Sequence, residues 1–334
     1  MGPILVIKLG ALGDFILSYR AMTAIRAHHA GAPLTLLTIP SLEPLARATR
    51  LFDDIWLDTR PKVQEPLAWR RLARRLNGGG FERVYDLQTA DRTGYYFRLM
   101  RFPFARRTPE WSGIAPGCSY RHDSPDRTTK HTLERQADQL AVAGIGREEY
   151  PPLDLSWVRA DISRHAFVRE GRPFALLVPG GSPGHLYKRW PAGCYGALAA
   201  TLADKGLAPV VIGTGVEADA CASVAAATPK AVNLCDDSPV MEVMALARAA
   251  ALAVGNDTGP LHLIAAMGCP TVALFSQASS PEFNRPRGPY EGPGALNPPP
   301  GREAATVTVI QEDDLGTLGV ERVLGALAKT LDLP

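Results

Sequence analysis

Short apolar runs alternate with stretches of helical periodicity along almost the whole chain. Seven runs have the length and composition of buried strands: 4–9, 33–38, 84–87, 174–178, 208–212, 251–254 and 271–275. Between them lie helix-like stretches such as 15–28, in which Phe15, Tyr19 and Met22 share one face. This alternation predicts parallel sheets covered by helices on both sides, and therefore an α/β fold.

The alternation loosens once, near residues 149–152, where Glu-Tyr-Pro-Pro stands. A fresh strand then begins at Phe174 and is followed by its own glycine-rich turn. We therefore expect two doubly wound domains, an N-terminal one over 1–160 and a C-terminal one over 161–334. Residues 279–303 are dense in proline and glycine, which predicts a long loop, and helical spacing returns over 318–331.

Composition and charge narrow the class of protein. A chain of 334 residues is long enough for two domains, each with its own core. A formal net charge of +2 argues against a nucleic-acid partner, and five scattered cysteines without a C-x-x-C pair favour a reducing compartment. The sequence shows neither a signal-peptide pattern nor an apolar run of membrane-spanning length. We expect a cytoplasmic protein.

The first apolar run leads into KLGALGD, residues 8–14, a turn with two glycines that opens a helix. A dinucleotide fingerprint would need G-x-G-x-x-G, whereas this turn has only Gly10 and Gly13, with Asp14 directly after them. Asp14 has two interpretations. It can cap the helix, or it can act as a general base toward a hydroxyl from a strand-to-helix loop.

The strongest local signal is VGNDTGPLHLIAAMGCPTVALF, residues 254–275. Asp257, Thr258 and Gly259 form a turn between a strand and a helix whose free N–H groups favour a phosphate. His262 follows Thr258 by four residues, so both can face one ligand if the turn is already helical. The alternative is that Asp257 and Thr258 cap the helix and that His262 packs against the sheet.

Two further loops of the C-terminal half can contact a phosphorylated ligand. Residues 178–191 contain three glycines, Ser182 as a donor and Lys188 as a cation, without the G-K-[ST] ending of a P-loop. Residues 213–220 place Glu217 at a helix start, where a carboxylate can accept hydrogen bonds from a ribose. A flexible basic surface loop and a simple partner of the helix dipole are the respective alternatives.

Together these loops resemble glycosyltransferase family nine, the ADP-heptose:lipopolysaccharide heptosyltransferases. Six segments carry the resemblance in the family's order: KLGALGD (8–14), VYDLQTADRTG (84–94), HTLERQADQLAVAGI (131–145), PGGS…KRWP (179–191), NLCDDSPVMEVMALA (233–247) and GNDTGPLHLIAAMGCPTVALF (255–275). The resemblance implies a GT-B fold of two facing Rossmann-like domains, with the acceptor on the N-terminal one and the nucleotide sugar on the C-terminal one. It also implies inverting transfer without a metal or other cofactor. The last helix can pack back on the N-terminal domain.

The resemblance also implies roles for single positions. Asp14 matches the base that deprotonates the acceptor hydroxyl, and Lys188 matches a lysine that stabilises charge on the departing diphosphate. The donor-binding positions are Ser182, Glu217, Asp257, Thr258, Gly259 and His262, with Glu217 at the ribose. On the acceptor side we expect Lys8, Gln88 and Arg92. No position is assigned to a metal.

Two segments depart from the family pattern, both near the donor. Residues 276–281 read SQASSP in place of Gly-Pro-Thr-[Asp/Ser]-Pro, and Asp236-Asp237 replace a common Gly-Lys. Another nucleotide sugar is therefore an alternative donor. A non-catalytic nucleotide-sugar-binding protein is a second alternative, disfavoured because Asp14, Lys188 and Asp257 are all retained. A dehydrogenase is disfavoured by the missing dinucleotide fingerprint.

The expected partners are a nucleotide-diphosphate sugar and a lipid-linked anionic glycan, with no nucleic acid. WRRLARRL, residues 69–76, places Trp69 and Leu72 on one helical face and four arginines on the other. These arginines form a solvated face, or they attract the acceptor at the cytoplasmic face of the inner membrane, together with Arg98, Arg101, Arg106 and Arg107. The second interpretation predicts peripheral contact with that membrane.

Overall fold

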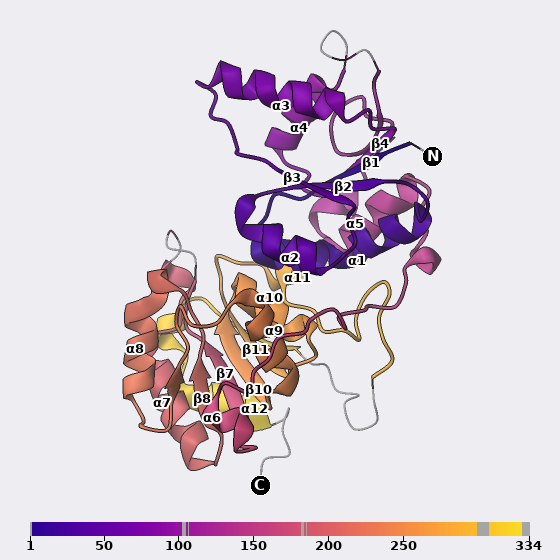
Figure 1. The fold of residues 1–334 in the computed structure, drawn as a ribbon. Coiled ribbons are helices and arrows are strands. Elements are labelled where there is room, and N and C mark those ends of the chain that lie inside the picture. Colours follow the sequence, from indigo (N-terminus) through magenta and orange to yellow (C-terminus); the bar gives the residue numbers. More distant parts are fainter. Residues whose placement is uncertain are drawn as a thin grey trace. The chain divides into compact units, whose positions relative to one another are not determined.

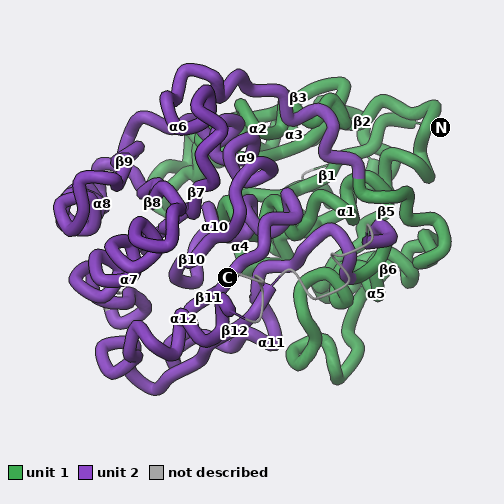
Figure 2. The backbone as a smooth tube through the Cα atoms, turned by 90° about the horizontal axis from the view of Figure 1, so that it is seen from below, with its two compact units in different colours: residues 1–153, 292–294 green, residues 154–291, 295–334 purple. Residues whose placement is uncertain are grey.

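A computed structural model describes residues 2–101, 105, 107–181, 184, 186–298 and 307–328. In it the chain divides into two compact units, coloured separately in Figure 2. Unit 1 consists of Met1–Leu153 and Gly292–Gly294, and unit 2 consists of Asp154–Glu291 and Ala295–Pro334. The change of unit after Leu153 precedes the boundary at residue 160 that we expected. Ser182 and Arg106 lie outside the described residues.

Unit 1 contains a parallel sheet with the strand order β3-β2-β1-β4-β5-β6. The central strand β1 (Ile4–Ile7) pairs with β2 (Leu34–Thr38) and with β4 (Arg83–Asp86). The outer strands are β3 (Asp54–Leu57), β5 (Glu110–Gly113) and β6 (Tyr120–Arg121). All four residues of β1 are buried, as expected for a parallel strand that has helices on both faces.

Helices cover the two faces of this sheet (Figure 1). On one face, α3 (Pro66–Gly78) and α4 (Asp91–Leu99) contribute Leu72, Leu76 and Tyr96 to a core with Leu5 and Ile7 of β1. On the other face, α1 (Leu12–His28) packs against α5 (Thr132–Val142). The shorter elements are α2 (Glu43–Ala48) and the 3-10 turns Pro40–Leu42, Pro125–Thr128 and Arg147–Glu149.

Unit 2 repeats this architecture with the strand order β9-β8-β7-β10-β11-β12. Its strands are β7 (Phe174–Val178), β8 (Ala208–Val211), β9 (Val232–Asn233), β10 (Leu252–Asn256), β11 (Thr271–Ser276) and β12 (Val307–Glu312). Counted within each unit, both sheets have the order 3-2-1-4-5-6, which is the Rossmann order. The two doubly wound α/β halves expected from the sequence are therefore confirmed.

Side chains of β7 alternate between two cores in unit 2. Ala175 and Leu177 face the core formed with α7 (Ala192–Asp204), α8 (Ala218–Ala226) and α12 (Val320–Ala328), and Leu176 faces the opposite one. The opposite core includes α6 (Ala166–Arg169), α9 (Val240–Ala249) and α10 (Gly259–Ala266). The remaining short elements are α11 (Pro281–Asn284) and the 3-10 turns Leu186–Lys188, Gly215–Glu217 and Leu315–Thr317.

The last helix differs from the expectation in its packing. We expected a helix over 318–331 that could pack back on the N-terminal domain, and the structure describes α12 over Val320–Ala328. Its apolar face is instead buried in unit 2, because Val323 and Leu327 complete the core beside α7. Within the described ranges, no helix is long and apolar enough to cross a membrane.

Candidate functional site

The sheet topology locates the candidate site within each unit. In open parallel sheets, ligands bind beyond the carboxyl ends of the strands at the point where successive connections turn to opposite faces. That point falls between β1 and β4 in unit 1 and between β7 and β10 in unit 2. Most predicted site residues follow these four strands: Lys8 and Asp14 after β1, Gln88 and Arg92 after β4, Lys188 after β7, and Asp257, Thr258, Gly259 and His262 after β10.

Asp14 lies in the first turn of α1, directly after the glycine turn. Gly10 has a φ of 115°, a conformation that glycine adopts without the steric cost of a Cβ. Asp14 Oδ2 accepts a hydrogen bond from the backbone N–H of Ala11 at 3.0 Å, so the carboxylate does cap its own helix. Its other oxygen, Oδ1, accepts no hydrogen bond from any described residue. One carboxylate can therefore serve both as a cap and as a base.

Lys8 is a buried cation beside this turn. Its ammonium donates to the Leu87 carbonyl at 3.3 Å. Burial lowers the pKa of Lys8, and the charges of Asp14 and Asp86 partly oppose that shift. The charge of Lys8 in turn lowers the pKa of Asp86 and so opposes part of the effect of burial on that carboxyl.

Gln88 and Arg60 hold the peptide that enters the glycine turn. Gln88 Oε1 accepts a hydrogen bond from the backbone N–H of Leu9 at 2.9 Å, and the Arg60 guanidinium donates to the Leu9 carbonyl. Gln88, which we expected at the acceptor, thus uses its carbonyl to position the turn and leaves its amide N–H groups available. Arg60 was not singled out from the sequence, because a lone arginine in a loop carries no local signal.

Arg92, the other expected acceptor residue, is engaged within unit 1. Its guanidinium donates to the Tyr96 hydroxyl at 3.2 Å and to the Pro61 carbonyl at 3.3 Å. The Tyr96 hydroxyl in turn donates to the buried carboxylate of Asp58. These bonds fasten α4 to the loop that precedes α3. Contact of Arg92 with an acceptor stays a prediction.

Three basic side chains that the sequence analysis did not single out lie in the segment that leads from β6 into α5: His122, Arg127 and Arg135. His122 is buried, and neither of its ring nitrogens has a partner in the described part of the chain; the same holds for the buried Arg127 Nε. Burial lowers the pKa of all three side chains. The negative charge of Asp86 partly opposes this shift at Arg127, and that of Asp14 partly opposes it at Arg135. Unpaired buried donors of this kind are suited to an anionic group of a substrate.

In unit 2, Asp257 is the centre of the polar contacts. Its Oδ2 accepts from the Ser279 hydroxyl at 3.0 Å and lies 3.5 Å from Lys188 Nζ, and its Oδ1 lies 3.9 Å from His262 Nε2. Burial acts to raise the pKa of Asp257, but the contacts with His262, Ser279 and Lys188 outweigh burial and lower it below the usual range. The structure thus brings together the predicted Lys188, Asp257 and His262.

Two atoms beside Asp257 are buried and unpaired. Thr258 occupies the N-cap position of α10, yet its hydroxyl makes no capping bond and Oγ1 has no partner among the residues that the structure describes. His262 Nδ1 is likewise buried without a partner. Gly259 is the first residue of α10. The interpretation of Thr258 as a cap is therefore wrong for its side chain, and both atoms are placed to contact a ligand at the helix N-terminus.

Asn256, which the sequence analysis missed, fixes the loop after β7. This fully buried amide donates to the carbonyls of Pro179 and Gly180, both at 2.9 Å. Its carbonyl accepts from the Trp190 backbone N–H at 3.0 Å and from the Tyr195 hydroxyl at 3.1 Å. One side chain thereby holds both ends of the segment that carries Lys188. The predicted Ser182 lies in this segment, outside the described residues.

Glu217 lies against the same glycine loop, since a Cβ added at Gly180 would stand 2.6 Å from Glu217 Cγ. Glu217 Oε2 accepts from the backbone N–H of Thr214 at 3.0 Å and from its hydroxyl. Asp236, in a left-handed conformation with φ of 57°, accepts from the Gly215 N–H at 2.6 Å and fastens the loop. Within the described residues, no group of three or more His, Cys, Asp or Glu is arranged to hold a metal.

Known proteins resemble this chain in sequence and in fold. The model of a family described as glycosyltransferase family 9 (heptosyltransferase) matches residues 69–292. Lipopolysaccharide heptosyltransferase 2 of Escherichia coli (strain K12) is 26% identical over 307 residues, which is 85% of both chains. The structure of a family 9 glycosyl transferase from Veillonella parvula DSM 2008 has a TM-score of 0.76 at 19% identity. The superposed residues make up 98% of this chain and 96% of the Veillonella chain. The structure of E. coli ADP-heptose lps heptosyltransferase II has a TM-score of 0.72 at 20% identity, covering 98% of each. The two structures show a shared fold.

The buried carboxyl of Asp86 generates a prediction about stability. Burial raises the pKa of Asp86 to about 6, although hydrogen bonds from Thr93 and from the N–H groups of Thr89 and Gln88 oppose the shift. The pKa of Asp86 in the unfolded chain is about 4. At a pH between this value and the folded pKa of about 6, the native state holds a proton that the unfolded state has lost, so the free energy of unfolding falls as pH rises. Asp86→Asn keeps the acceptor and removes the titration.

Urea unfolding of the wild type and Asp86→Asn at a series of pH values measures this effect. The free energy of unfolding of the wild type, relative to the variant, is expected to decrease by about 3 kcal/mol between about pH 4 and pH 7. Parallel pH profiles for the two proteins would show that Asp86 titrates normally.

Proposed function

The chain belongs to glycosyltransferase family 9, and on this premise we propose that it transfers a heptose from ADP-heptose to the core of a lipopolysaccharide. The observation that carries the proposal is the group around Asp257, where Lys188, His262 and the unpaired Thr258 hydroxyl meet at the N-terminus of α10. The matched relative named lipopolysaccharide heptosyltransferase 2 supports heptose as the sugar. The structural neighbour E. coli ADP-heptose lps heptosyltransferase II supports ADP as its carrier.

The donor half supplies charge where the leaving group develops it. The N-terminus of α10 presents backbone N–H groups and the positive end of its dipole to a diphosphate. Lys188 adds a partly buried ammonium, which the ionised Asp257 holds at 3.5 Å. These fixed positive groups stabilise the departing ADP without a metal ion. Glu217 retains an oxygen for a ribose hydroxyl while its other oxygen caps the loop.

The acceptor half supplies the base. Asp14 Oδ1 takes the proton of an acceptor hydroxyl as the oxygen attacks the anomeric carbon and the bond to ADP breaks. A single displacement with one base inverts the configuration at that carbon, as in inverting glycosidases, where the base activates the incoming oxygen. The unpaired donors of His122 and Arg127 favour an acceptor with a carboxylate or phosphate beside the attacking hydroxyl.

A lipid-linked anionic acceptor also sets where the protein acts. We place the chain in the cytoplasm, in peripheral contact with the inner membrane, because the acceptor lipid is anchored there.

One observation favours a second candidate, in which another nucleotide sugar is the donor. The segment 276–281 departs from the family pattern, and its Ser279 contacts Asp257 directly. Ser276 of the same segment has a buried, unpaired hydroxyl. A changed hydrogen-bonding surface next to the donor motif can select a different sugar, since a site that pairs with one hydroxyl pattern rejects another.

The direct test mixes the protein with ADP-heptose or with a panel of other nucleotide sugars, each with a lipopolysaccharide-core acceptor, and follows nucleotide release. Release is expected from ADP-heptose, at an equal rate with and without EDTA. Release from another nucleotide sugar alone would favour the second candidate. Loss of activity in EDTA, restored by Mg²⁺ or Mn²⁺, would refute the metal-independent mechanism.

Asp14→Asn is expected to lower kcat by about 10²–10⁴-fold, the usual contribution of a positioned base. Asparagine keeps the acceptor for the Ala11 N–H, so thermal stability and donor affinity stay at the wild-type level. Asp14→Ala serves as the control, because it also removes the cap and costs about 1 kcal/mol of stability. Turnover of Asp14→Asn within about threefold of the wild type would assign the base elsewhere.

Lys188→Ala is expected to weaken ADP binding by about tenfold or more, because a charge-assisted contact to phosphate is lost. Adenosine binding, which involves no phosphate, is expected to stay unchanged in calorimetric titrations. Lys205→Ala, an exposed lysine at the end of α7, is the matched control and should bind ADP as the wild type does. Equal losses for ADP and adenosine would contradict the phosphate role.

A further inference from the structure

The outer surface of α3 and α4 takes no part in the transfer described above, although it has an unusual composition. Three of the seven large apolar side chains that are exposed in the described part of the chain lie here: Val63 (86%), Leu67 (68%) and Tyr95 (55%). Trp69 stacks edge-on against Tyr95, with 6.4 Å between the ring centroids. A cavity of about 390 Å³ is lined by Val63, Trp69 and Tyr95 together with Arg98 and Leu99. We call Val63, Leu67, Trp69 and Tyr95 the apolar patch.

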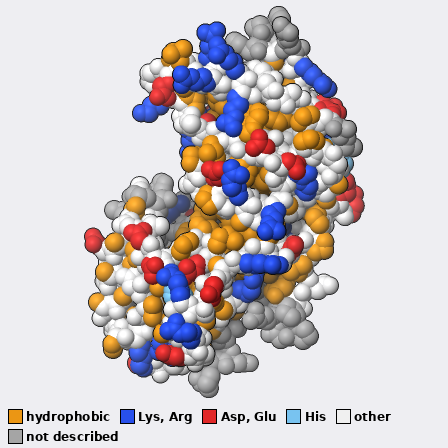
Figure 3. Space-filling view, viewed as in Figure 1, with side chains coloured by type: hydrophobic (Ala, Val, Ile, Leu, Met, Phe, Trp, Pro, Cys, Tyr) orange, Lys and Arg blue, Asp and Glu red, His pale blue; other side chains and the backbone are white. Residues whose placement is uncertain are grey.

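Arginines adjoin this patch on the same helix. Leu67, Arg70, Arg71 and Arg74 are spaced at i, i+3, i+4 and i+7, so they share the outward face of α3, opposite the buried Leu72 and Leu76. None of the three arginines forms an ion pair with a described residue. Figure 3 shows basic side chains gathered over α3 next to hydrophobic ones.

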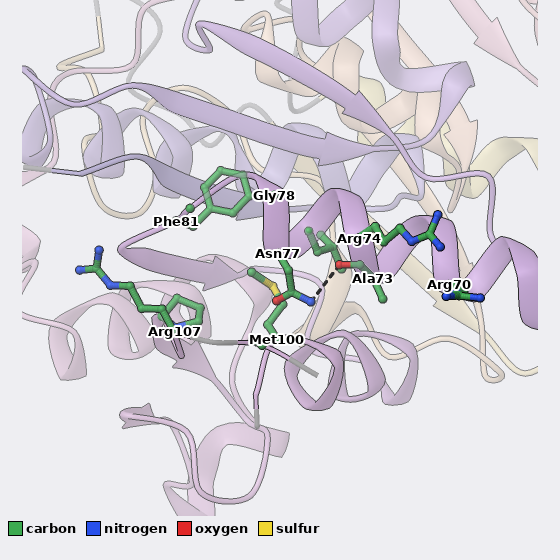
Figure 4. A pocket seen from close by; sticks show the side chains of 12 residues that line it. Arg70, Ala73, Arg74, Asn77, Gly78, Phe81, Met100 and Arg107 are labelled. Carbon is green, nitrogen blue, oxygen red and sulfur yellow. Dashed lines mark hydrogen bonds between the residues drawn. The ribbon is translucent and has the colours of Figure 1, made fainter. Parts of the chain in front are cut away.

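The positive charge is concentrated in this part of the chain. Residues 60–107 contain twelve Lys and Arg against four Asp and Glu, a net charge of +8, while the whole chain has a formal net charge of +2. The remainder of the chain is therefore net negative. A second cavity, of about 550 Å³, lies on the other side of α3 and is lined by Arg70, Arg74 and Arg107 together with Phe81 and Met100 (Figure 4).

The two cavities differ in their relation to the candidate site. The one in Figure 4 is lined by Gly80 and Phe81, just before β4, and by Pro109, just before β5, so it lies at the amino ends of the strands. The apolar patch instead lies where α3 begins, after the chain has left the carboxyl end of β3. It is tied to the candidate site by the loop before α3, in which Arg60 binds the Leu9 carbonyl.

We propose that the apolar patch and the arginines of α3 dock unit 1 onto an anionic lipid bilayer. Both parts of this surface match that partner: cationic guanidinium groups pair with lipid phosphates, while exposed Val63 and Leu67 beside a Trp–Tyr pair suit the interfacial zone. The inference rests on the proposed lipid-linked acceptor. A bilayer at the start of α3 delivers the glycan of such a lipid to the edge of the sheet that carries Asp14.

Binding to vesicles of phosphatidylglycerol and of phosphatidylcholine tests the proposal by co-sedimentation of the full chain. The wild type binds phosphatidylglycerol vesicles, and high salt weakens the binding because screening shortens the reach of the charges. Each arginine is worth about fivefold, so the R70Q/R71Q/R74Q variant is expected to bind about a hundredfold more weakly. Phosphatidylcholine vesicles are bound weakly by both proteins.

The matched control removes three exposed arginines elsewhere in unit 1. Arg47, Arg121 and Arg147 are each paired with an acidic residue, and R47Q/R121Q/R147Q is expected to bind as the wild type does. A V63S/L67S variant, changed only at exposed positions, tests the apolar part and is also expected to bind more weakly. If the wild type does not bind anionic vesicles, or if the control loses as much as the α3 variant, the surface does not dock on membranes.

Transfer assays separate this proposal from the proposed reaction. With a water-soluble, delipidated acceptor, R70Q/R71Q/R74Q is expected to keep wild-type kcat and KM, whereas with acceptor embedded in vesicles its kcat/KM falls. Equal losses with both acceptors would place these arginines in glycan recognition and overturn the docking role. Vesicle binding does not depend on the donor, so it remains a valid test even if ADP-heptose is not the substrate.

Discussion

The hydrogen bonds of Asn256 are the constraint on which the donor half depends. A buried side-chain amide left without partners costs about 1–3 kcal/mol, so the four partners of Asn256 fix the backbone at Pro179, Gly180 and Trp190 as one unit. The next residue in the chain is Asp257. A single fully satisfied amide at the end of β10 thereby positions the glycine loop, the segment with Lys188 and the carboxylate that meets it.

Unit 1 applies the same principle at the end of its own central strand. Gln88 and Arg60 bind the two sides of the Leu9 peptide, and the glycine turn that follows carries Asp14 into α1. In both units side chains hold the backbone of the turn, while Asp14 Oδ1 and Thr258 Oγ1, at the carboxyl ends of the strands, have no partner among the described residues. Rigid support beneath under-bonded side chains is the arrangement that preorganised binding requires.

The sequence predicted what periodicity and glycine spacing encode. All seven expected strands are present, with ends within two residues, because central parallel strands are continuous apolar runs. The five missed strands lie outside the centre of their sheets, and two of them, β6 and β9, are only two residues long. The cluster around Asp257 was predicted from one motif and the family resemblance. Asn256, Ser279 and Arg127 were missed because their roles depend on contacts between distant segments, which no local spacing reveals.

The choice between cap and functional group was posed wrongly for two carboxylates. Asp14 and Glu217 each use one oxygen to accept a backbone N–H of a turn, which orients the side chain, and the second oxygen accepts no hydrogen bond from a described residue. Capping therefore supplies the orientation that a base or a ribose ligand needs. A site built in this way couples local helix stability to function, so a substitution is informative about chemistry only when it preserves the capping acceptor. Asp14→Asn meets this condition because asparagine keeps an oxygen for the Ala11 N–H, whereas Asp14→Ala removes it.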